Sequence, residues 1–461
     1  MADRMQILVL FKGDMIEPIY KAVVSAEQKS LQDQQYKFLK KMVQTLVELG
    51  SQLCAIWSSK ENGKSKDQIR PENFQTYLNA LLFFSQHPSI VVNFYANNLW
   101  AQFCRHSDIS QDDIFITYLP KWIEVASKKV VKIGLPSKDN HRSCAYSKLD
   151  FDNDEEFSSY FGRCRIILLD TIRAVSSINP SIPYRFVDTW LRDVLGKPLD
   201  FGHPKDGRCN ENSPAYLELS AIPSVLDACL TLKGTPSNDD LQVLSPAVEL
   251  LKLCLDFQSS DPLIISTVLS CISSLFVVVN VTPGALMPTL NKIFSCITFS
   301  SNSDVIATNN SVSSGSSMSK EVKSLRRHGC ALLVKIGQRH PSALLGVFEH
   351  LRSTIVDELY LKRRALQRME YVTLIEALVL VSNEHANFNI QASFLENVSS
   401  PICNQLRSME SVISNAAAFI NYIGLGSDNS NVDKYGENRG ELAFCIQVCN
   451  LYKIYVLICE I

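Results

Sequence analysis

The sequence predicts an all-α fold, an α-solenoid in which helix pairs stack into a superhelix. Apolar residues recur at the 3.6-residue helical period along nearly the whole chain, with short breaks between the segments. The β-strand signal is weak, and its best stretch, 277–281, fits the end of a helix better. Successive helix pairs repeat at about forty residues, as in helical-repeat arrays, whose stacked units leave a long concave surface.

Seventeen helices are predicted, and many begin at a helix-start signal. At Asp261-Pro262 and at Thr282-Pro283, a capping side chain directly precedes a proline that suits the first helical turn. In chain order the predicted helices span residues 5–26, 31–57, 71–85, 90–106, 111–133, 155–178, 183–195, 214–232, 241–257, 262–279, 283–299, 320–339, 341–358, 365–382, 390–407, 409–422 and 437–461.

Three longer breaks in the helical pattern are predicted to be loops, at 135–156, 196–213 and 300–319. The last of these is nearly all Ser, Asn and Thr, and we expect it to be mobile. The helical pattern resumes unchanged after each break. We therefore expect a single solenoid segment over residues 1–461, with the loops emerging between its helices.

The composition bounds the class of protein. Hydrophobic residues make up 46% of the 461 residues and charged residues 20%, as in globular proteins. The formal net charge is only −2, so nucleic-acid binding would require local segregation of charge. The 14 cysteines include no C-x-x-C pair, which is typical of reduced core thiols. No apolar run approaches the ~20 residues that span a bilayer, so we expect no membrane insertion.

An acidic pattern that resembles a calcium loop is better explained as a solvated loop that caps the next helix. Asp150, Asp152 and Asp154 alternate as the first ligands of such a loop do. However, Glu155 stands where the sharp turn needs glycine, and Phe161 stands where a bidentate glutamate is required. We therefore exclude a calcium site.

Other ligand and catalytic motifs are also absent or incomplete. Gly424 and Gly426 resemble the start of a dinucleotide loop, but Asn429 occupies the third glycine position, so a helix C-terminal turn is the better interpretation. His328 and Cys330 on one predicted helix are more often packing neighbours than metal ligands. No nucleophile, acid–base pair or metal set is visible, so we expect neither an enzyme nor a cofactor.

Two basic clusters remain. The predicted helix 320–339 carries Lys320, Lys323, Arg326, Arg327, Lys335 and Arg339 against the single acid Glu321, and a second cluster comprises Lys362, Arg363, Arg364 and Arg368. The clusters lie one helix pair apart, so a stack would place them side by side. Arginine outnumbers lysine across them, and its guanidinium suits phosphate oxygens. A solvated helix face is the common alternative. Aromatic interleaving is absent, which favours recognition of a folded RNA by shape over base stacking.

The segment 134–161, GLPSKDNHRSCAYSKLDFDNDEEFSSYF, resembles the exportin-5 family of karyopherins, within the importin-β superfamily. Further segments are similar to the central portion of that family in the same order: YKFLKKMVQTLVELGSQLCAIW, LDFQSSDPLIISTVLSCISSLF, LRRHGCALLVKI and LIEALVLVSNE. The resemblance covers nearly the whole chain. It implies a solenoid of HEAT-like repeats, also described as armadillo-like.

The resemblance also implies a function. Members of this family are nuclear export receptors that carry structured double-stranded RNA, such as pre-microRNA, from nucleus to cytoplasm with RanGTP. The implied partners are RNA with a short 3′ overhang, tRNA as a further cargo, RanGTP and nucleoporins. The competing hypothesis from the residues alone is a helical-repeat scaffold for protein–protein interaction without RNA-export activity.

Some RNA-contacting positions of the family can be placed on this sequence. The arginine that contacts the overhang falls on Arg327, with Arg326 and His328 beside it. A small polar residue one helical turn later falls on Ala331, whose side chain cannot form a hydrogen bond. The basic character of the implied site is kept, while this polar contact is lost.

Two further pairs complete the implied site. A polar pair of the family falls on Gln367 and Arg368, where arginine departs from the usual pattern. An acidic residue of the overhang pocket falls on Asp170, with Arg173 one turn later. The sequence also departs from the family by a few extra residues around 362–366. The family's N-terminal arch, which holds most Ran contacts, has no counterpart, and the resemblance stops near Cys449. We therefore expect truncation at both ends relative to the family.

Overall fold

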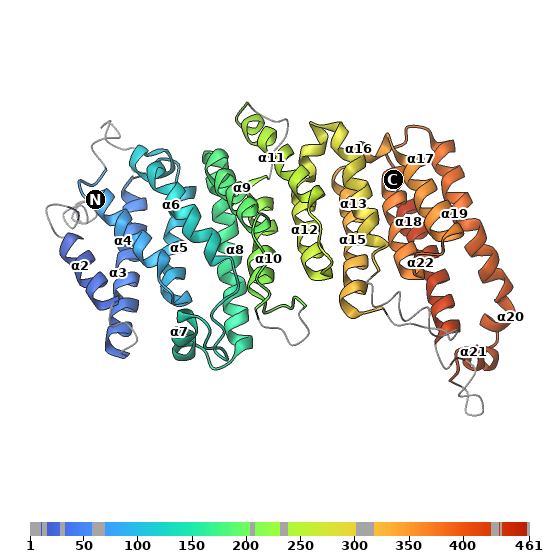
Figure 1. Ribbon diagram of the computed structural model, residues 1–461, viewed down its shortest axis with the longest axis horizontal. Helices are drawn as coiled ribbons and strands as arrows, with labels where there is room; N and C mark the ends of the chain where they lie inside the picture. The colour runs from blue at the N-terminus through green and yellow to red at the C-terminus, as the bar shows by residue number, and fades with distance from the viewer. Residues whose placement is uncertain are drawn as a thin grey trace. The chain divides into compact units, whose positions relative to one another are not determined.

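A computed structural model describes residues 11, 16–27, 33–57, 70–202, 208–230, 238–300, 318–425, 433 and 436–458. Helices joined by turns and loops account for all of these residues, and no strand occurs among them, which confirms the predicted all-α fold (Figure 1). The chain divides into two compact units, Met1–Phe257 and Gln258–Ile461. The expectation of one solenoid segment across both units stays a prediction.

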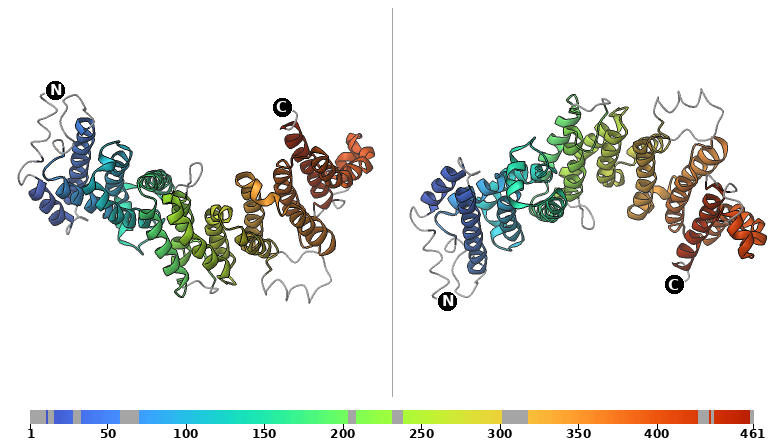
Figure 2. Two further views of the ribbon diagram at one scale, coloured as in Figure 1. Left: turned by 90° about the horizontal axis from the view of Figure 1, so that it is seen from above. Right: turned by 90° about the horizontal axis from the view of Figure 1, so that it is seen from below.

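Unit 1 consists of two layers of helices, and within each layer successive helices pack side by side (Figures 1 and 2). One layer contains α3 (Asp33–Trp57), α5 (Ile90–Arg105), α8 (Asp154–Ile178) and α10 (Pro214–Cys229). The other contains α2 (Ile16–Glu27), α4 (Phe74–Gln86), α6 (Asp113–Lys129), α9 (Ser181–Leu195) and α11 (Asn238–Asp256). The short helices η3 (Ile109–Gln111) and α7 (Arg142–Asp150) lie in the connections.

Helices of one layer run parallel, as side-chain contacts at a constant sequence offset show. Gln44 donates to the Tyr95 hydroxyl at 3.1 Å, and Ser51 donates to Gln102 at 3.0 Å, so α3 and α5 keep an offset of 51 residues. Because neighbouring helices of a layer run in the same direction, the chain that joins them must return through the other layer. This is the arrangement of stacked helix pairs.

Buried aromatic rings join the two layers of unit 1. Trp100 of α5 stacks on Trp122 of α6 with ring centroids 5.9 Å apart, and both side chains are fully buried. Trp122 also donates its indole N–H to Asn97 at 3.0 Å, so the buried polar atom has a partner. These contacts fix the pairing of α5 with α6.

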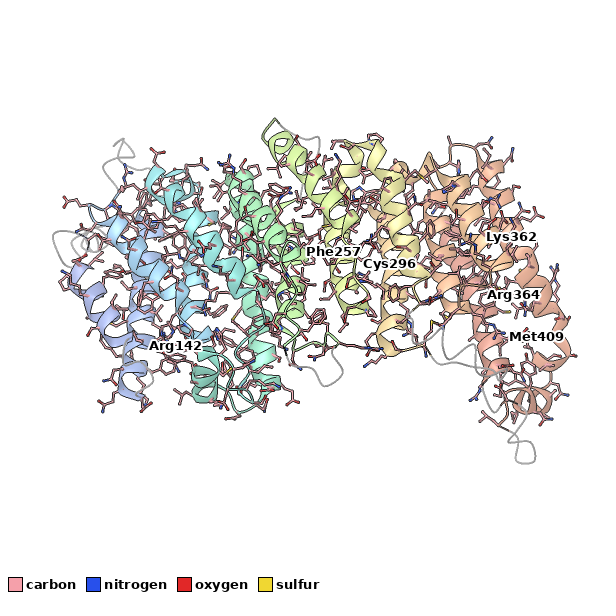
Figure 3. The ribbon with its side chains drawn as sticks, in the orientation of Figure 1. Arg142, Phe257, Cys296, Lys362, Arg364 and Met409 are labelled. Carbon is pink, nitrogen blue, oxygen red and sulfur yellow. The ribbon has the colours of Figure 1, made fainter. Side chains whose placement is uncertain are left out.

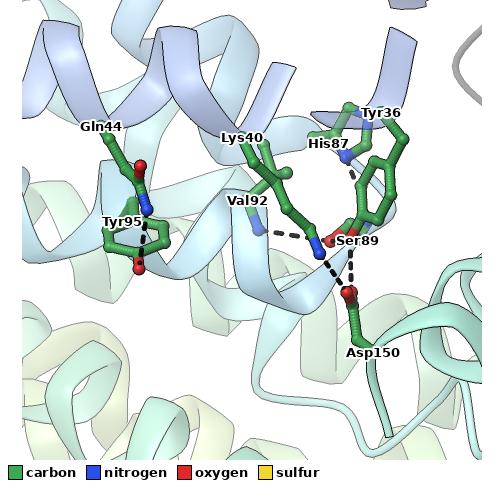
Figure 4. A network of polar contacts seen from close by, with 8 residues as sticks. All are labelled: Tyr36, Lys40, Gln44, His87, Ser89, Val92, Tyr95 and Asp150. Carbon is green, nitrogen blue, oxygen red and sulfur yellow. Dashed lines mark hydrogen bonds and ion pairs between the residues drawn. The ribbon is translucent and has the colours of Figure 1, made fainter. Parts of the chain in front are cut away.

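Helix α7 lies in the segment 135–156, which was wrongly predicted to be a loop. It spans only nine residues and has a weak apolar pattern. The side chain of Asp150 at its end is only 4% exposed and accepts hydrogen bonds from the Tyr36 hydroxyl and the Lys40 ammonium group of α3 (Figure 4). Ser89 Oγ lies 2.7 Å from the same hydroxyl, so this polar network attaches α7 to α3 and to the start of α5.

Unit 2 repeats the layered plan. One layer contains α12 (Pro262–Leu275), α15 (Lys320–Arg339), α18 (Arg368–Ser382) and α22 (Glu437–Ile458), each packed on the next. Around them lie η4 (Phe276–Asn280), η5 (Pro283–Ala285), α13 (Leu286–Ile297), α16 (Pro341–Leu345), α17 (Phe348–Arg352), the π-helix η6 (Ser353–Lys362), α19 (Phe388–Ser408), α20 (Glu410–Ile413) and α21 (Ala416–Tyr422).

Several predicted elements of unit 2 differ from the structure. The predicted helix 341–358 is broken into α16, α17 and η6, and 409–422 forms two short helices. Asp261 caps α12 as predicted, because its carboxylate accepts from the Leu263 and Ile264 amides at 2.9 and 3.2 Å. Thr282 makes no such side-chain contact, so its predicted capping role is wrong. Residues 203–207 and 301–317, in two of the predicted loops, lie outside the described residues.

The stretch 262–280 is the one described segment that is long and apolar enough to cross a membrane by length and composition. It contradicts the expectation that no apolar run approaches this length. In the structure it forms α12 and η4, and 56% of the apolar window is buried within the protein. Burial of this kind is what a core helix of a layered fold requires.

Thiol side chains lie mostly in the core. Of the 13 described cysteines, ten are buried and none forms a disulfide. Burial raises the pKa of several of these thiols, for example that of Cys330 to about 12. Such thiols stay protonated at neutral pH and behave as small apolar side chains.

Candidate nucleic-acid interface

Helix α15 has one buried face and one exposed face. Ser319 caps its first turn by accepting from the Val322 amide at 3.3 Å. The predicted apolar positions Val322, Leu325, Cys330, Leu333 and Ile336 are buried, whereas Val334 is only partly so. The exposed positions include Lys320, Ser324, Arg327 and Ala331, which follow one another at helical spacing.

Two glycines let α15 approach its neighbours closely. A Cβ at Gly329 would lie 2.8 Å from Ile297 of α13, and one at Gly337 would lie 3.3 Å from the Ala377 carbonyl of α18. Any larger residue at Gly329 would therefore require the Ile297 side chain, or one of the two helices, to shift. The position of the exposed face of α15 relative to α18 depends on these contacts.

Arg326 does not point to solvent, although it was a predicted RNA contact. Its guanidinium is buried between α15 and α18 and forms a two-pronged ion pair with Glu370, with Nε–Oε1 at 2.8 Å and Nη2–Oε2 at 2.6 Å. The side chains are only 7% and 3% exposed. A guanidinium held in this way has a structural role, and the expectation for Arg326 is corrected accordingly.

The same ion pair holds the segment that precedes α18. Arg326 Nη2 also donates to the Ala365 carbonyl at 2.6 Å, and the Gln367 amide donates to Glu370 Oε2 at 2.9 Å. Glu370 was not predicted as a site residue. The only sequence signal for it is its place three residues after Gln367, which is the spacing of a capping box.

Arg327, the next residue, is exposed and makes no hydrogen bond or ion pair with the described part of the chain. His328 turns instead toward α12, where Nδ1 lies 2.7 Å from Ser266 Oγ. Burial, with the nearby Lys335 adding to it, holds the pKa of His328 below its ordinary value, so the ring is neutral at pH 7. Ala331 is exposed and offers only a methyl group.

The second basic cluster lies on the turn 362–368, which runs from the last residue of η6 to the first residue of α18. Lys362, Arg363, Arg364, Gln367 and Arg368 are all exposed, and Figure 3 labels Lys362 and Arg364. The Glu358 carboxylate neutralises part of this charge, because it lies 2.5 Å from Lys362 Nζ and 3.9 Å from Arg363 Nε. Arg368 donates to the Glu437 carbonyl at the start of α22 at 3.2 Å.

Asp170 and Arg173 belong to α8 in unit 1, whereas the other predicted site residues belong to unit 2. They form an ion pair with each other at 2.5 Å, and Arg173 Nη2 lies 3.8 Å from Asp227 Oδ2 of α10. All three side chains are about two-fifths exposed. The two carboxylates offset the positive charge of Arg173, so this part of the predicted site is not a cationic surface.

Comparison with known proteins gives one consistent result. The family model described as the Exportin-5 family matches residues 33–458. Exportin-5 of Homo sapiens is 31% identical over 458 residues, which are 96% of this chain and 37% of the human protein. Exportin-5 of Mus musculus is also 31% identical over 96% of this chain and 37% of its own, and Exportin-5 of Dictyostelium discoideum is 26% identical over 86% and 34%. The chain thus spans little more than a third of the length of these relatives.

Proposed function

Because the chain belongs to the Exportin-5 family, we propose that it is part of a nuclear export receptor whose unit 2 binds structured double-stranded RNA through phosphate groups. The cargo class is a stem with a short 3′ overhang, such as pre-microRNA, with tRNA as a second cargo. Transport would depend on RanGTP and run from nucleus to cytoplasm past nucleoporins, so the protein would shuttle between these compartments. The role is that of a receptor and not of an enzyme.

The observation that carries this proposal is the exposed position of Arg327 at the end of α15 that contacts the basic turn 362–368. Arg327 follows Arg326, whose guanidinium contacts Ala365 within that turn. The exposed Arg327 and the turn therefore lie at the same end of the α15–α18 pair. Guanidinium groups donate in pairs to phosphate oxygens, and duplex RNA is read mainly through its backbone and shape.

The competing function is a helical-repeat scaffold for protein–protein interaction. It is favoured by the two arginines that the structure removes from the expected basic surface. Arg326 is buried in an ion pair, and Arg173 is shared between two carboxylates. A scaffold would show no preference for RNA over other polyanions.

Fluorescence anisotropy separates the two functions. We expect the protein to bind a labelled RNA hairpin with a 3′ overhang more tightly than a blunt hairpin or heparin, and to lose affinity steeply as salt rises. Arg327→Ala should weaken binding and reduce the slope of log K against log salt by about one. The control is Arg407→Ala on α19, an exposed arginine outside the layer that contains α15 and α18. Equal, weak binding of all three ligands would support the scaffold instead.

Ran dependence has its own test. Immobilised protein is incubated with RanGTP or RanGDP, each with and without the hairpin. We expect RanGTP and hairpin to be retained together, with each increasing retention of the other, because linkage between two ligands is reciprocal. Retention of the hairpin alone, unchanged by either form of Ran, would leave RNA binding in place and contradict the Ran-dependent part.

A further inference from the structure

The turn 362–368 has an unusual backbone. It begins at the last residue of η6, a ten-residue π-helix, and π-helical turns are rare and frequently found at functional sites. The Arg363 amide donates to the Glu358 carbonyl and the Ala365 amide to the Leu359 carbonyl, both at 2.9 Å. Between them, Arg364 has φ +47°, in the left-handed region that residues with a side chain rarely adopt.

Contacts from outside the turn hold this conformation. Arg326 of α15 donates to the Ala365 carbonyl at 2.6 Å, and Glu370 accepts from the Gln367 amide at 2.9 Å. Leu366 is buried. The ion pair between Arg326 and Glu370 therefore holds the turn on both sides of Leu366.

Cationic side chains are what this clamped turn presents. The side chains of Lys362 and Arg363 are 67% and 68% exposed. Arg364 is exposed and makes no hydrogen bond or ion pair with the described residues. Among the described carboxylates, Glu358 contacts Lys362 and Arg363 but not Arg364, and the charge of Asp357 also acts on Lys362. A rigid loop with cations directed outward suits an anion with several oxygens, because little ordering remains to be done on binding.

We propose that the turn 362–368 is a preformed site for the phosphate groups of duplex RNA, in which Arg363 and Arg364 make the contacts and the Arg326–Glu370 ion pair positions them. This inference rests on the function proposed above and extends it. The two arginines lie outside the set expected from family resemblance, which in unit 2 comprises Arg326, Arg327, His328, Ala331, Gln367 and Arg368. Arg326 acts through the turn and is a positioning residue, not a contact.

The contact is tested by removing the charge without changing the backbone. Arg364→Asn keeps a residue that tolerates positive φ. We expect about a fivefold loss of hairpin affinity and a salt slope lower by about one, as for one lost phosphate contact. Arg407→Asn is the matched control and should change neither. Unchanged affinity and slope in Arg364→Asn would overturn the inference.

The positioning role of the Arg326–Glu370 ion pair is tested with a variant for which a charge effect and loss of the ion pair predict opposite changes in RNA affinity. Glu370→Gln removes a negative charge near the RNA. If charge alone mattered, affinity would rise, whereas loss of the clamp should lower it severalfold. Arg326→Lys keeps the charge but cannot reach both Glu370 and Ala365, so it should lower affinity too. In a protein that already carries Arg364→Asn, Glu370→Gln or Arg326→Lys should lower hairpin affinity less than it does in the unaltered protein, because both substitutions act on the same turn. A rise in affinity, or additive effects, would contradict the clamp.

Amide hydrogen exchange tests the inference on the unaltered protein, so the result does not depend on whether a variant folds. We expect the amides of Ala365 and Gln367 to be protected without RNA and to gain little when the hairpin binds. Protection that arises only with RNA would show that the turn is not preformed. If the unaltered protein fails to prefer the hairpin over heparin, the proposed function fails. If Arg327→Ala weakens binding and Arg364→Asn does not, only the present inference fails.

Discussion

Arg326 and Glu370 join α15 to α18 through two parallel hydrogen bonds of 2.8 and 2.6 Å, and both side chains are almost fully buried. A buried ion pair of this geometry contributes modest net stability, since both ions lose their hydration. Its removal from one side only is costly, because the remaining charge stays buried without a partner.

Arg326→Ala should therefore destabilise unit 2. We expect a loss of about 3–5 kcal/mol in the free energy of unfolding, measured by urea denaturation. The control is Arg327→Ala, which removes the neighbouring, exposed arginine and should change stability by less than about 0.5 kcal/mol. Similar effects of the two substitutions would contradict the buried position of Arg326.

Gly329→Ala should destabilise the protein by overpacking. The added Cβ would lie 2.8 Å from Cγ1 of Ile297, so this side chain or one of the two helices must shift, at a cost of about 1–3 kcal/mol. Gly162→Ala on α8 is the matched control, because apart from its chain neighbours and the backbone of its own helix no atom lies within 4 Å of the position of its Cβ. There alanine should stabilise the helix by up to about 1 kcal/mol. Thermal unfolding of both variants gives the comparison, and a neutral Gly329→Ala would argue against the close α13–α15 contact.

Asp150→Asn should loosen the attachment of α7 to α3. The carboxylate is buried and accepts from both Tyr36 and Lys40, so its loss should cost about 1–3 kcal/mol. The nearby exposed pair of Lys148 and Asp139 provides the control. Asp139→Asn should cost less than about 1 kcal/mol, as is usual for surface ion pairs. The two variants are compared by urea denaturation, and equal losses would refute the structural role of Asp150.

His87 should make unit 1 sensitive to acid. Burial, with the charges of Lys129 and Arg142 adding to it, lowers the pKa of His87 from 6.5 to about 3. Between these pH values the unfolded chain binds a proton that the folded chain does not, so stability falls as pH falls from 6.5 toward 3. The slope from this residue is at most about 1.4 kcal/mol per pH unit.

His87→Asn isolates this effect. The His87 ring accepts from the Ser89 amide at 3.0 Å, and an asparagine side chain can accept from the amide two residues on. The free energy of unfolding of the variant, measured from pH 7 to pH 4, should fall less steeply than that of the unaltered protein. Parallel curves would show that His87 is not kept neutral by the fold.

Helix positions and buried faces could be predicted because periodicity encodes them. Val322, Leu325 and Cys330 share a stripe on α15 in the sequence and are buried in the structure. Arg326 lies at the edge of the same stripe, but the charge of its side chain led to the prediction that it is exposed. Its partner Glu370 is 44 residues away, and only the register of α15 on α18 brings the two together. The π-helical turns of η6 and the left-handed Arg364 have no periodic signal, so the sequence showed this turn only as a cluster of charges.

The parallel register within each layer is independent of the length of chain between neighbouring helices. The matching contacts are 51 residues apart from α3 to α5, 62 from α12 to α15 and 44 from α15 to α18. Connecting segments can therefore lengthen or shorten while the layers keep their alignment. New recognition elements can be inserted between helices with little effect on folding, and the same places suit the insertion of a fluorescent tag or an epitope.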